Sequence, residues 1–176
     1  MWRDNGCNAH ETRLPRWRRL PAGDKMAAMA EILFYHLETR ALEAVMPLLL
    51  EKTLERGWRA VVEVGSRERA EVLDAHLWTY RDDSFLPHGL AGEGSDESQP
   101  ILLTTDAENP NGATVRFFVD RAVPQSAGDY TRLVYLFSGL DPDALAEARL
   151  AWKALRADND VTYWQQEGDG RWVKKA

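Results

Sequence analysis

Short apolar runs alternate with amphipathic segments along most of this chain. Runs rich in β-branched and aromatic residues predict strands at Glu31–Leu37, Arg59–Val64, Ile101–Thr105, Thr114–Asp120, Arg132–Phe137 and, as a short final strand, Val161–Gln165. Apolar residues at helical spacing predict helices over Ala41–Arg56, Ser66–Trp78 and Asp141–Ala157. The strand–helix–strand–helix order of the first half predicts parallel strands joined by crossover helices.

Local signals agree with these boundaries. Gly57 is suited to end the first predicted helix, and Ser66 is suited to cap the N-terminus of the second. Asp141-Pro142 is a typical start for the third. Pro47 lies within the first predicted helix, where a proline normally removes a backbone hydrogen bond. We therefore expect it in the first turn of that helix, where no intrahelical N–H is needed. The predicted fold class is α/β: a single three-layer domain with a Rossmann-like, mostly parallel sheet flanked by helices.

Residues 1–28 do not share this pattern. They carry six basic and three acidic side chains, whereas residues 29–176 carry 16 basic and 25 acidic ones (22 − 6 and 28 − 3). The segment has no apolar core typical of a secretory signal and no periodicity. We predict a disordered basic extension at 1–28 and one α/β domain at 29–176. A basic arm that touches nucleic acid is the alternative.

Composition narrows the classes of function. The net charge of −6 argues against broad non-specific DNA binding, although it leaves room for one local basic patch. Cys7 is the single cysteine, so the sequence predicts no disulfide framework and no thiolate metal site. No apolar run approaches the roughly 20 residues of a membrane helix. We therefore expect a cytoplasmic protein without a membrane contact.

The most informative stretch is Leu77–Gly94, LWTYRDDSFLPHGLAGEG. Trp78, Tyr80 and Phe85 are large apolar residues, while Pro87 and the glycines disfavour any helix or strand that would absorb them. Loops run over the surface, so part of this apolar area should stay exposed. Exposed aromatic area among polar neighbours is more typical of a partner surface than of a catalytic pocket.

The run Phe85-Leu86-Pro87-His88-Gly89-Leu90-Ala91-Gly92-Glu93-Gly94, preceded by Leu77-Trp78, closely resembles the signature loop of the chi subunit of bacterial DNA polymerase III. The resemblance extends from about Met29 to Trp164. It implies a small α/β subunit of the polymerase III holoenzyme, a DNA-directed DNA polymerase complex, with no catalytic site of its own. Such a subunit links the clamp loader to single-stranded DNA-binding protein (SSB) during DNA replication, and contacts single-stranded DNA only indirectly.

The resemblance also implies a partner for the loop. Trp78, Phe85, Pro87 and Leu90 match the region by which chi-like proteins contact the psi subunit, so psi or another clamp-loader component is the expected partner. The alternative is that these side chains fold back onto the body of the domain.

The last predicted helix carries a second candidate site. Arg149 and Lys153 are four residues apart and Arg156 follows three later, which creates a cationic face at a small cost in helix stability. The segment Ala148–Arg156 is similar to the C-terminal helix of the chi family. The resemblance implies that Arg149, Trp152 and Lys153, with Arg156 beside them, bind the acidic C-terminal tail of SSB, which ends in phenylalanine. The family usually has tyrosine at the position of Trp152.

Other interpretations of that helix stay open. A basic face near a helix C-terminus also opposes the macrodipole, and Trp152 could be part of the core. The sequence shows no phosphate loop, and Gly89-x-x-Gly92-x-Gly94 follows a helix, unlike a dinucleotide fingerprint. We therefore predict no catalytic residue, no cofactor and no metal. The alternatives are a small α/β hydrolase or transferase that uses His88, and a protein that binds single-stranded DNA directly.

Overall fold

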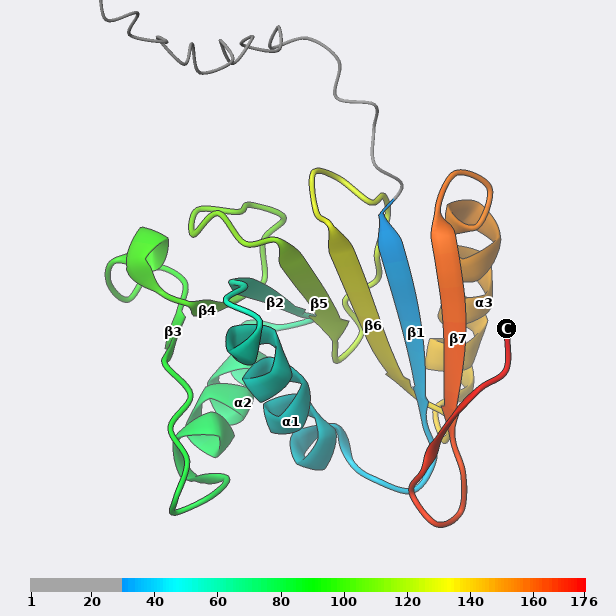
Figure 1. Ribbon diagram of the computed structural model, residues 1–176, viewed down its shortest axis with the longest axis horizontal. Helices are drawn as coiled ribbons and strands as arrows, with labels where there is room; N and C mark the ends of the chain where they lie inside the picture. The colour runs from blue at the N-terminus through cyan, green and yellow to red at the C-terminus, as the bar shows by residue number, and fades with distance from the viewer. Residues whose placement is uncertain (1–29) are drawn as a thin grey trace, which may run out of the picture.

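The predicted strands join one eight-stranded sheet in the order β3-β4-β2-β5-β6-β1-β7-β8 (Figure 1). The computed structural model describes residues 30–176, so the prediction for residues 1–28 lies outside the described residues. Neighbouring strands are parallel, apart from the antiparallel pair β7 and β8. The strands are β1 (Glu31–Leu37), β2 (Ala60–Val64), β3 (His88–Leu90), β4 (Ile101–Thr104), β5 (Val115–Val119), β6 (Arg132–Ser138), β7 (Asp160–Gln166) and β8 (Trp172–Lys174).

Helices lie on both faces of the sheet, which confirms the predicted three-layer α/β class. They are α1 (Leu42–Glu55), α2 (Arg67–Thr79) and α3 (Pro142–Leu155). α1 and α2 pack on one face over a core that contains Leu50, Leu73 and Phe117, and α3 packs on the other face over a core that contains Phe34 and Tyr135. In Figure 1, α1 and α2 lie in front of the sheet and α3 behind it.

Two short strands and a short 3-10 helix, Asp96–Ser98, were not predicted. β3 lies inside the stretch that was expected to contain no strand, and it forms because its three residues pair in register with the start of β4. β8 lies in the C-terminal tail, for which the sequence pattern gave no element, and it pairs with β7 as a hairpin. In both cases the hydrogen bonds of a neighbouring strand decide the conformation, and such pairing leaves no periodic signal in the segment itself.

Pro47 corrects the prediction for the first helix, because it lies in the second turn of α1, not the first. A proline there removes the N–H that would bond to the carbonyl of residue 43. His76 of α2 replaces the missing donor, since its Nε2 lies 2.8 Å from the carbonyl oxygen of Glu43. The interior proline is therefore tolerated because a neighbouring helix satisfies the exposed carbonyl.

We expect His76→Ala to lower the free energy of unfolding by about 1 kcal/mol, the usual size of one hydrogen bond of this kind. The effect should shrink in a Pro47→Ala background, where the restored N–H of residue 47 can bond to Glu43. Urea denaturation of the four proteins of this cycle measures the coupling. An equal loss in both backgrounds would contradict the explanation.

Arg116 makes several hydrogen bonds near β5 and the loop between β4 and β5. It lies on β5 and is only 3% exposed. Its Nη2 lies 2.7 Å from Glu63 Oε2, and its Nη1 donates to the carbonyl oxygens of Ala107 and Glu108 at 3.0 and 3.1 Å. The same Nη1 lies 2.6 Å from the hydroxyl of Tyr130. One buried guanidinium thus fixes the loop between β4 and β5 against the sheet.

Among residues 30–176, no helix covers the α1 side of the sheet at its other end, over β1 and β7. On β1, Ile32 and Phe34 point toward α3 and are fully buried, whereas Leu33 and Tyr35 point to the opposite face and are half-buried. None of residues 160–165 in β7 is buried. No helix lies in front of β1 and β7 in Figure 1. We call the surface formed by Leu33, Tyr35, Trp164 and Trp172 the open sheet face.

Candidate functional site

The cationic residues of the last helix lie on its outer surface. Asp141 caps α3, since its Oδ1 accepts the N–H groups of Asp143 and Ala144 at 2.9 and 3.2 Å. The buried side of the helix consists mainly of alanines, so it packs closely against β1 and β6. The opposite side exposes Arg149, Lys153 and Arg156.

Trp152 stands between these cations and the sheet. Its ring makes edge-to-face contacts with Phe34 and Tyr163, at centroid distances of 5.3 and 5.8 Å. The side chain is half-buried, so it is neither a purely internal residue nor a free surface one. Trp152 and Tyr163 therefore form an aromatic seam between α3 and β7.

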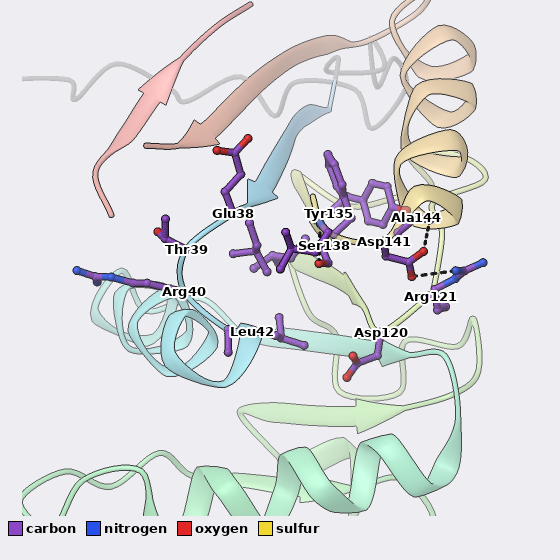
Figure 2. Close-up of a pocket in the computed structure, with 15 residues that line it drawn as sticks. Glu38, Thr39, Arg40, Leu42, Asp120, Arg121, Tyr135, Ser138, Asp141 and Ala144 are labelled. Atoms are coloured by element: carbon purple, nitrogen blue, oxygen red, sulfur yellow. Dashed lines mark hydrogen bonds and ion pairs between the residues drawn. The ribbon is translucent and has the colours of Figure 1, made fainter. Parts of the chain in front are cut away.

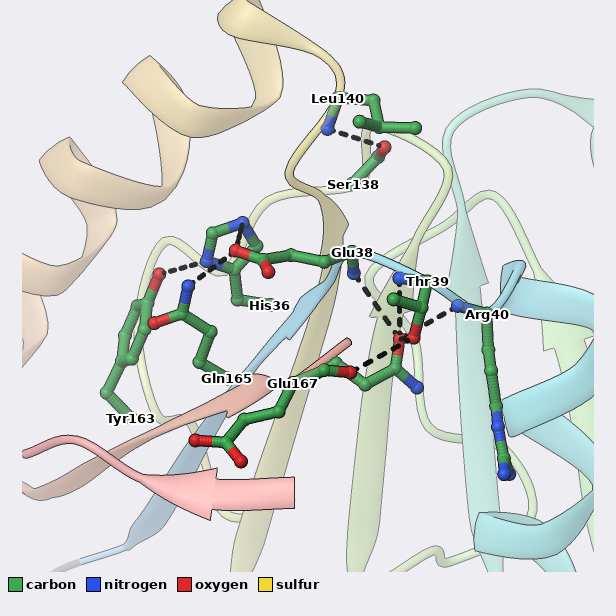
Figure 3. Close-up of polar contacts among 10 residues, drawn as sticks. His36, Glu38, Thr39, Arg40, Ser138, Leu140, Tyr163, Gln165 and Glu167 are labelled. Atoms are coloured by element: carbon green, nitrogen blue, oxygen red, sulfur yellow. Dashed lines mark hydrogen bonds and ion pairs between the residues drawn. The ribbon is translucent and has the colours of Figure 1, made fainter. Parts of the chain in front are cut away.

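Arg149 lies close to this seam. Burial raises the pKa of the Tyr163 hydroxyl, the charge of Glu38 raises it further, and the nearby Arg149 guanidinium lowers it. Tyr163 Oη and His36 Nδ1 share a hydrogen bond of 2.8 Å (Figure 3). Burial also lowers the pKa of His36, which keeps its imidazole neutral at pH 7. A cation thus borders a half-buried, uncharged aromatic group.

The three cations are also free of local partners. Within residues 30–176, no carboxylate lies within ion-pair distance of Arg149, Lys153 or Arg156. At the other end of the same helix, Arg121 pairs with Asp141 at 3.1 Å and with Glu147 at 2.6 Å. The C-terminal half of α3 therefore offers unneutralised positive charge to an anionic ligand.

The four residues predicted in the signature loop separate into two groups. Trp78 and Phe85 are 56% and 68% exposed, and their rings lie 5.9 Å apart. Pro87 beside them is half-buried. Leu90 lies in β3 and is buried in the core under α2, so its side chain supports the loop from inside and does not reach the surface.

His88 holds the loop to α2. Its side chain is fully buried, its Nδ1 lies 2.6 Å from the carbonyl oxygen of Leu86, and its Nε2 lies 3.3 Å from Oδ1 of Asp74. Its ring also contacts Trp78, with a centroid distance of 4.7 Å. Both ring nitrogens are thus engaged by the protein, which is the arrangement of a positioning residue.

A cavity of about 500 Å³ lies at the carboxyl ends of β1, β5 and β6 (Figure 2). β1 continues into α1 on one face and β6 continues into α3 on the other, so this is the topological switch point where ligands bind in open α/β sheets. Its floor is apolar and includes Tyr135, whose pKa burial raises to about 12. On the rim, Asp120 pairs with Arg69 at 3.1 Å, and Arg121 has the acidic partners already described.

The loop after β1 shows why this cavity differs from a phosphate site. Successive backbone N–H groups before a helix are the usual cradle for a phosphate. Here the N–H groups of Thr39 and Arg40 donate to Oε1 of Gln166 at 3.0 and 2.9 Å, and the Thr39 hydroxyl donates to the same oxygen at 3.1 Å. In Figure 3, Thr39 and Arg40 converge on this contact. A buried side chain from β7 thus occupies the cradle.

Two further features of the described residues bear on function. Within residues 30–176, no group of three or more histidine, cysteine, aspartate or glutamate side chains is arranged to hold a metal ion. Over the same range, none of the helices has the length and apolar composition needed to span a membrane.

The profile of a family described as "DNA polymerase III chi subunit, HolC" matches residues 29–161. The chain belongs to the chi subunit family of DNA polymerase III. The match covers β1 through α3 and the start of β7, so it includes both the signature loop and the cationic helix. The resemblance inferred from the loop is thereby confirmed.

Two curated relatives carry the chi name. The chain is 29% identical over 92 residues to a probable DNA polymerase III subunit chi from Rickettsia prowazekii, which is 52% of this chain and 56% of that protein. It is 34% identical over 82 residues to DNA polymerase III subunit chi from Escherichia coli, which is 43% of this chain and 56% of that protein. The matches thus span about half the length of these curated relatives.

A solved structure supports the fold alone. The C-terminal domain of a Dbp5 variant from S. cerevisiae, solved with a Gle1 variant and IP6, superposes with a TM-score of 0.50 at 10% identity. The superposition covers 77% of this chain and 90% of that domain. At so low an identity, the likeness describes the arrangement of sheet and helices.

Tyr163 is the site residue that sequence reasoning missed in this chi-family chain. It was predicted only as part of a short final strand. Its position opposite Trp152 follows from the pairing of β7 with β1, which places Tyr163 beside Phe34. Val161 and Tyr163 are apolar residues two positions apart. This spacing is the signal that could have placed both side chains on the face of β7 that packs against α3.

Proposed function

We propose that this protein is a non-catalytic accessory subunit of the bacterial DNA polymerase III holoenzyme, which links the clamp loader to the acidic C-terminal tail of SSB during DNA replication. The observation that carries the proposal is that Arg149 and Lys153, which have no acidic partner within residues 30–176, lie beside the aromatic seam of Trp152 and Tyr163. In this role the protein works in the cytoplasm, and SSB gives it an indirect link to single-stranded DNA.

The chemistry of the tail suits this surface. Arginine can hold a terminal carboxylate through two parallel hydrogen bonds, while lysine supplies a mobile point charge. The last phenylalanine of the tail can pack against the edge of the Trp152–Tyr163 seam. Upstream acidic residues of the tail can lie along Arg156, one turn further along the helix surface.

We expect a fluorescent SSB tail peptide to bind the full-length chain with saturation, and Arg149→Ala to weaken that binding about 10- to 100-fold. The loss corresponds to charge-assisted hydrogen bonds of about 1.5–3 kcal/mol. Fluorescence anisotropy at constant salt measures both affinities. A peptide without the final phenylalanine should show a comparable loss.

Lys52→Ala is the matched control, because Lys52 is also an exposed cation but lies on α1, on the other face of the sheet. It should leave the tail affinity unchanged. Equal losses in Arg149→Ala and Lys52→Ala would mean that the peptide senses only overall charge, and would contradict a site on α3. Trp152→Tyr, which restores the residue usual in the family, should retain binding.

The second contact in this proposal is the aromatic pair of the signature loop. Trp78 and Phe85 expose a contiguous apolar surface, and the buried contacts of His88 hold the loop in place beneath it. Rigid, exposed aromatic side chains are the usual anchors of protein interfaces. We assign this surface to psi or another component of the clamp loader.

A further inference from the structure

The open sheet face is a second surface of unusual composition. Its residues come from β1, β7 and β8, the strands at the end of the sheet that α1 does not cover. The rings of Tyr35 and Trp172 meet edge to face at a centroid distance of 4.8 Å. Trp164 is the direct neighbour of Tyr35 in the pairing of β1 with β7. Three half-buried aromatic side chains therefore lie side by side on adjacent strands.

Cations border these aromatics on the side of α1. A cavity of about 180 Å³ opens there, lined by Leu33, Tyr35, Lys52, Arg56 and Arg132 among others. The guanidinium groups of Arg56 and Arg132 lie 5.3 and 5.1 Å from the centre of the Trp58 ring, so Trp58 joins the two cations.

The local charge balance is positive at the cavity. Arg132 is paired with Glu31, at 2.6 Å between Nε and Oε2. Within residues 30–176, Lys52 and Arg56 have no carboxylate within ion-pair distance. The acids of this face, Glu31 and Asp160, are neighbours at the amino ends of β1 and β7. A ligand at this cavity therefore meets two cations, Lys52 and Arg56, that no carboxylate of the described residues neutralises.

We propose that the open sheet face binds single-stranded nucleic acid directly. Bases can stack on Tyr35, Trp164 and Trp172, while the backbone phosphates lie along Lys52, Arg56 and Arg132. Aromatic residues on an uncovered sheet are an established way to stack about two or three bases, and a cationic border that follows the backbone is the usual complement. The overall charge of −6 does not oppose this, because the cations are gathered in one place.

The aromatic row decides against an acidic peptide as the occupant. Such a peptide would satisfy the cations but would offer few flat rings for three adjacent aromatic side chains. Every nucleotide brings one flat base and one phosphate. A strand that stacks its bases on the aromatic row can place its phosphates on the cations beside that row. The face is also distinct from the α3 surface, since β1 and β7 lie between them.

We expect a fluorescein-labelled oligothymidine of about 15 nucleotides to bind the full-length chain at low salt. The logarithm of affinity should fall with the logarithm of salt concentration with a slope of about −1.4, because the two unneutralised cations would neutralise about two phosphates on a single strand. The variant Lys52→Glu/Arg56→Glu, which changes only exposed side chains, should weaken binding at least about tenfold and flatten that slope. Trp172→Leu should weaken binding about tenfold through lost stacking.

The matched control is Arg149→Glu/Lys153→Glu, which reverses two exposed cations on the opposite face. It should lose the tail peptide and keep the oligonucleotide, whereas Lys52→Glu/Arg56→Glu should do the reverse. Oligonucleotide binding that survives Lys52→Glu/Arg56→Glu would overturn the proposal, as would no saturation up to about 100 µM protein. Loss of the tail peptide in Lys52→Glu/Arg56→Glu alone would show that this face takes an acidic peptide instead. Failure of tail binding at α3 would leave the oligonucleotide outcomes unaffected.

Discussion

Arg116→Met should lower the free energy of unfolding by about 3–5 kcal/mol, the range expected when one partner of a buried ion pair is removed. Arg116 is 3% exposed, so its loss leaves the Glu63 carboxylate without its counter-charge in a partly buried position. It also leaves the carbonyl groups of the loop between β4 and β5 without their donor. Chemical denaturation of the two proteins measures the difference.

The double variant Arg116→Met/Glu63→Leu tests the cause. Replacing both members of a buried pair by apolar residues is often neutral. We expect the double variant to recover part of the loss, with the remainder due to the loop carbonyls. A double variant no more stable than Arg116→Met would show that the loop contacts, and not the charge pair, account for the effect.

Phe85→Ala should weaken binding to the psi subunit or the clamp loader by about 2–4 kcal/mol while leaving the stability of the protein unchanged. Phe85 is 68% exposed, so truncation removes little from the core, but its ring forms half of the surface that it shares with Trp78. Isothermal titration with the purified partner, together with thermal unfolding, measures both quantities.

Two comparisons make this prediction specific. Leu140→Ala removes an apolar side chain that is even more exposed, at 83%, beside the switch-point cavity, and it should not change partner binding. Leu90→Ala should lower stability instead, because Leu90 is buried beneath the loop. Similar losses of binding for Phe85→Ala and Leu140→Ala would mean that the partner does not use the signature loop.

Much of the sheet follows from local patterns in the sequence. The apolar runs of β1, β2, β5 and β6 are long enough, and rich enough in β-branched and aromatic residues, to predict strands within two residues. The Ser66 and Asp141 caps act on N–H groups within three residues, so they are equally visible. These features depend only on neighbours in the chain.

The features that could not be predicted depend on residues far apart in the chain. The second-turn position of Pro47 depends on His76, and the burial of Arg116 depends on Glu63 and on loop carbonyls. The exposed position of Arg149 was suggested by helical spacing, but the seam beside it needed Tyr163 from β7. The open sheet face was invisible because Tyr35, Trp164 and Trp172 share a surface only after three strands pair.

The Gln166 contact has a consequence for how this protein behaves in a cell. Where a fold of this class uses a bound nucleotide to order the loop after its first strand, stability rises and falls with the nucleotide concentration. Here the amide oxygen of Gln166 already satisfies the N–H groups of Thr39 and Arg40. Because the chain orders this loop with its own side chain, we expect its thermal stability to stay the same whether ATP is present or absent.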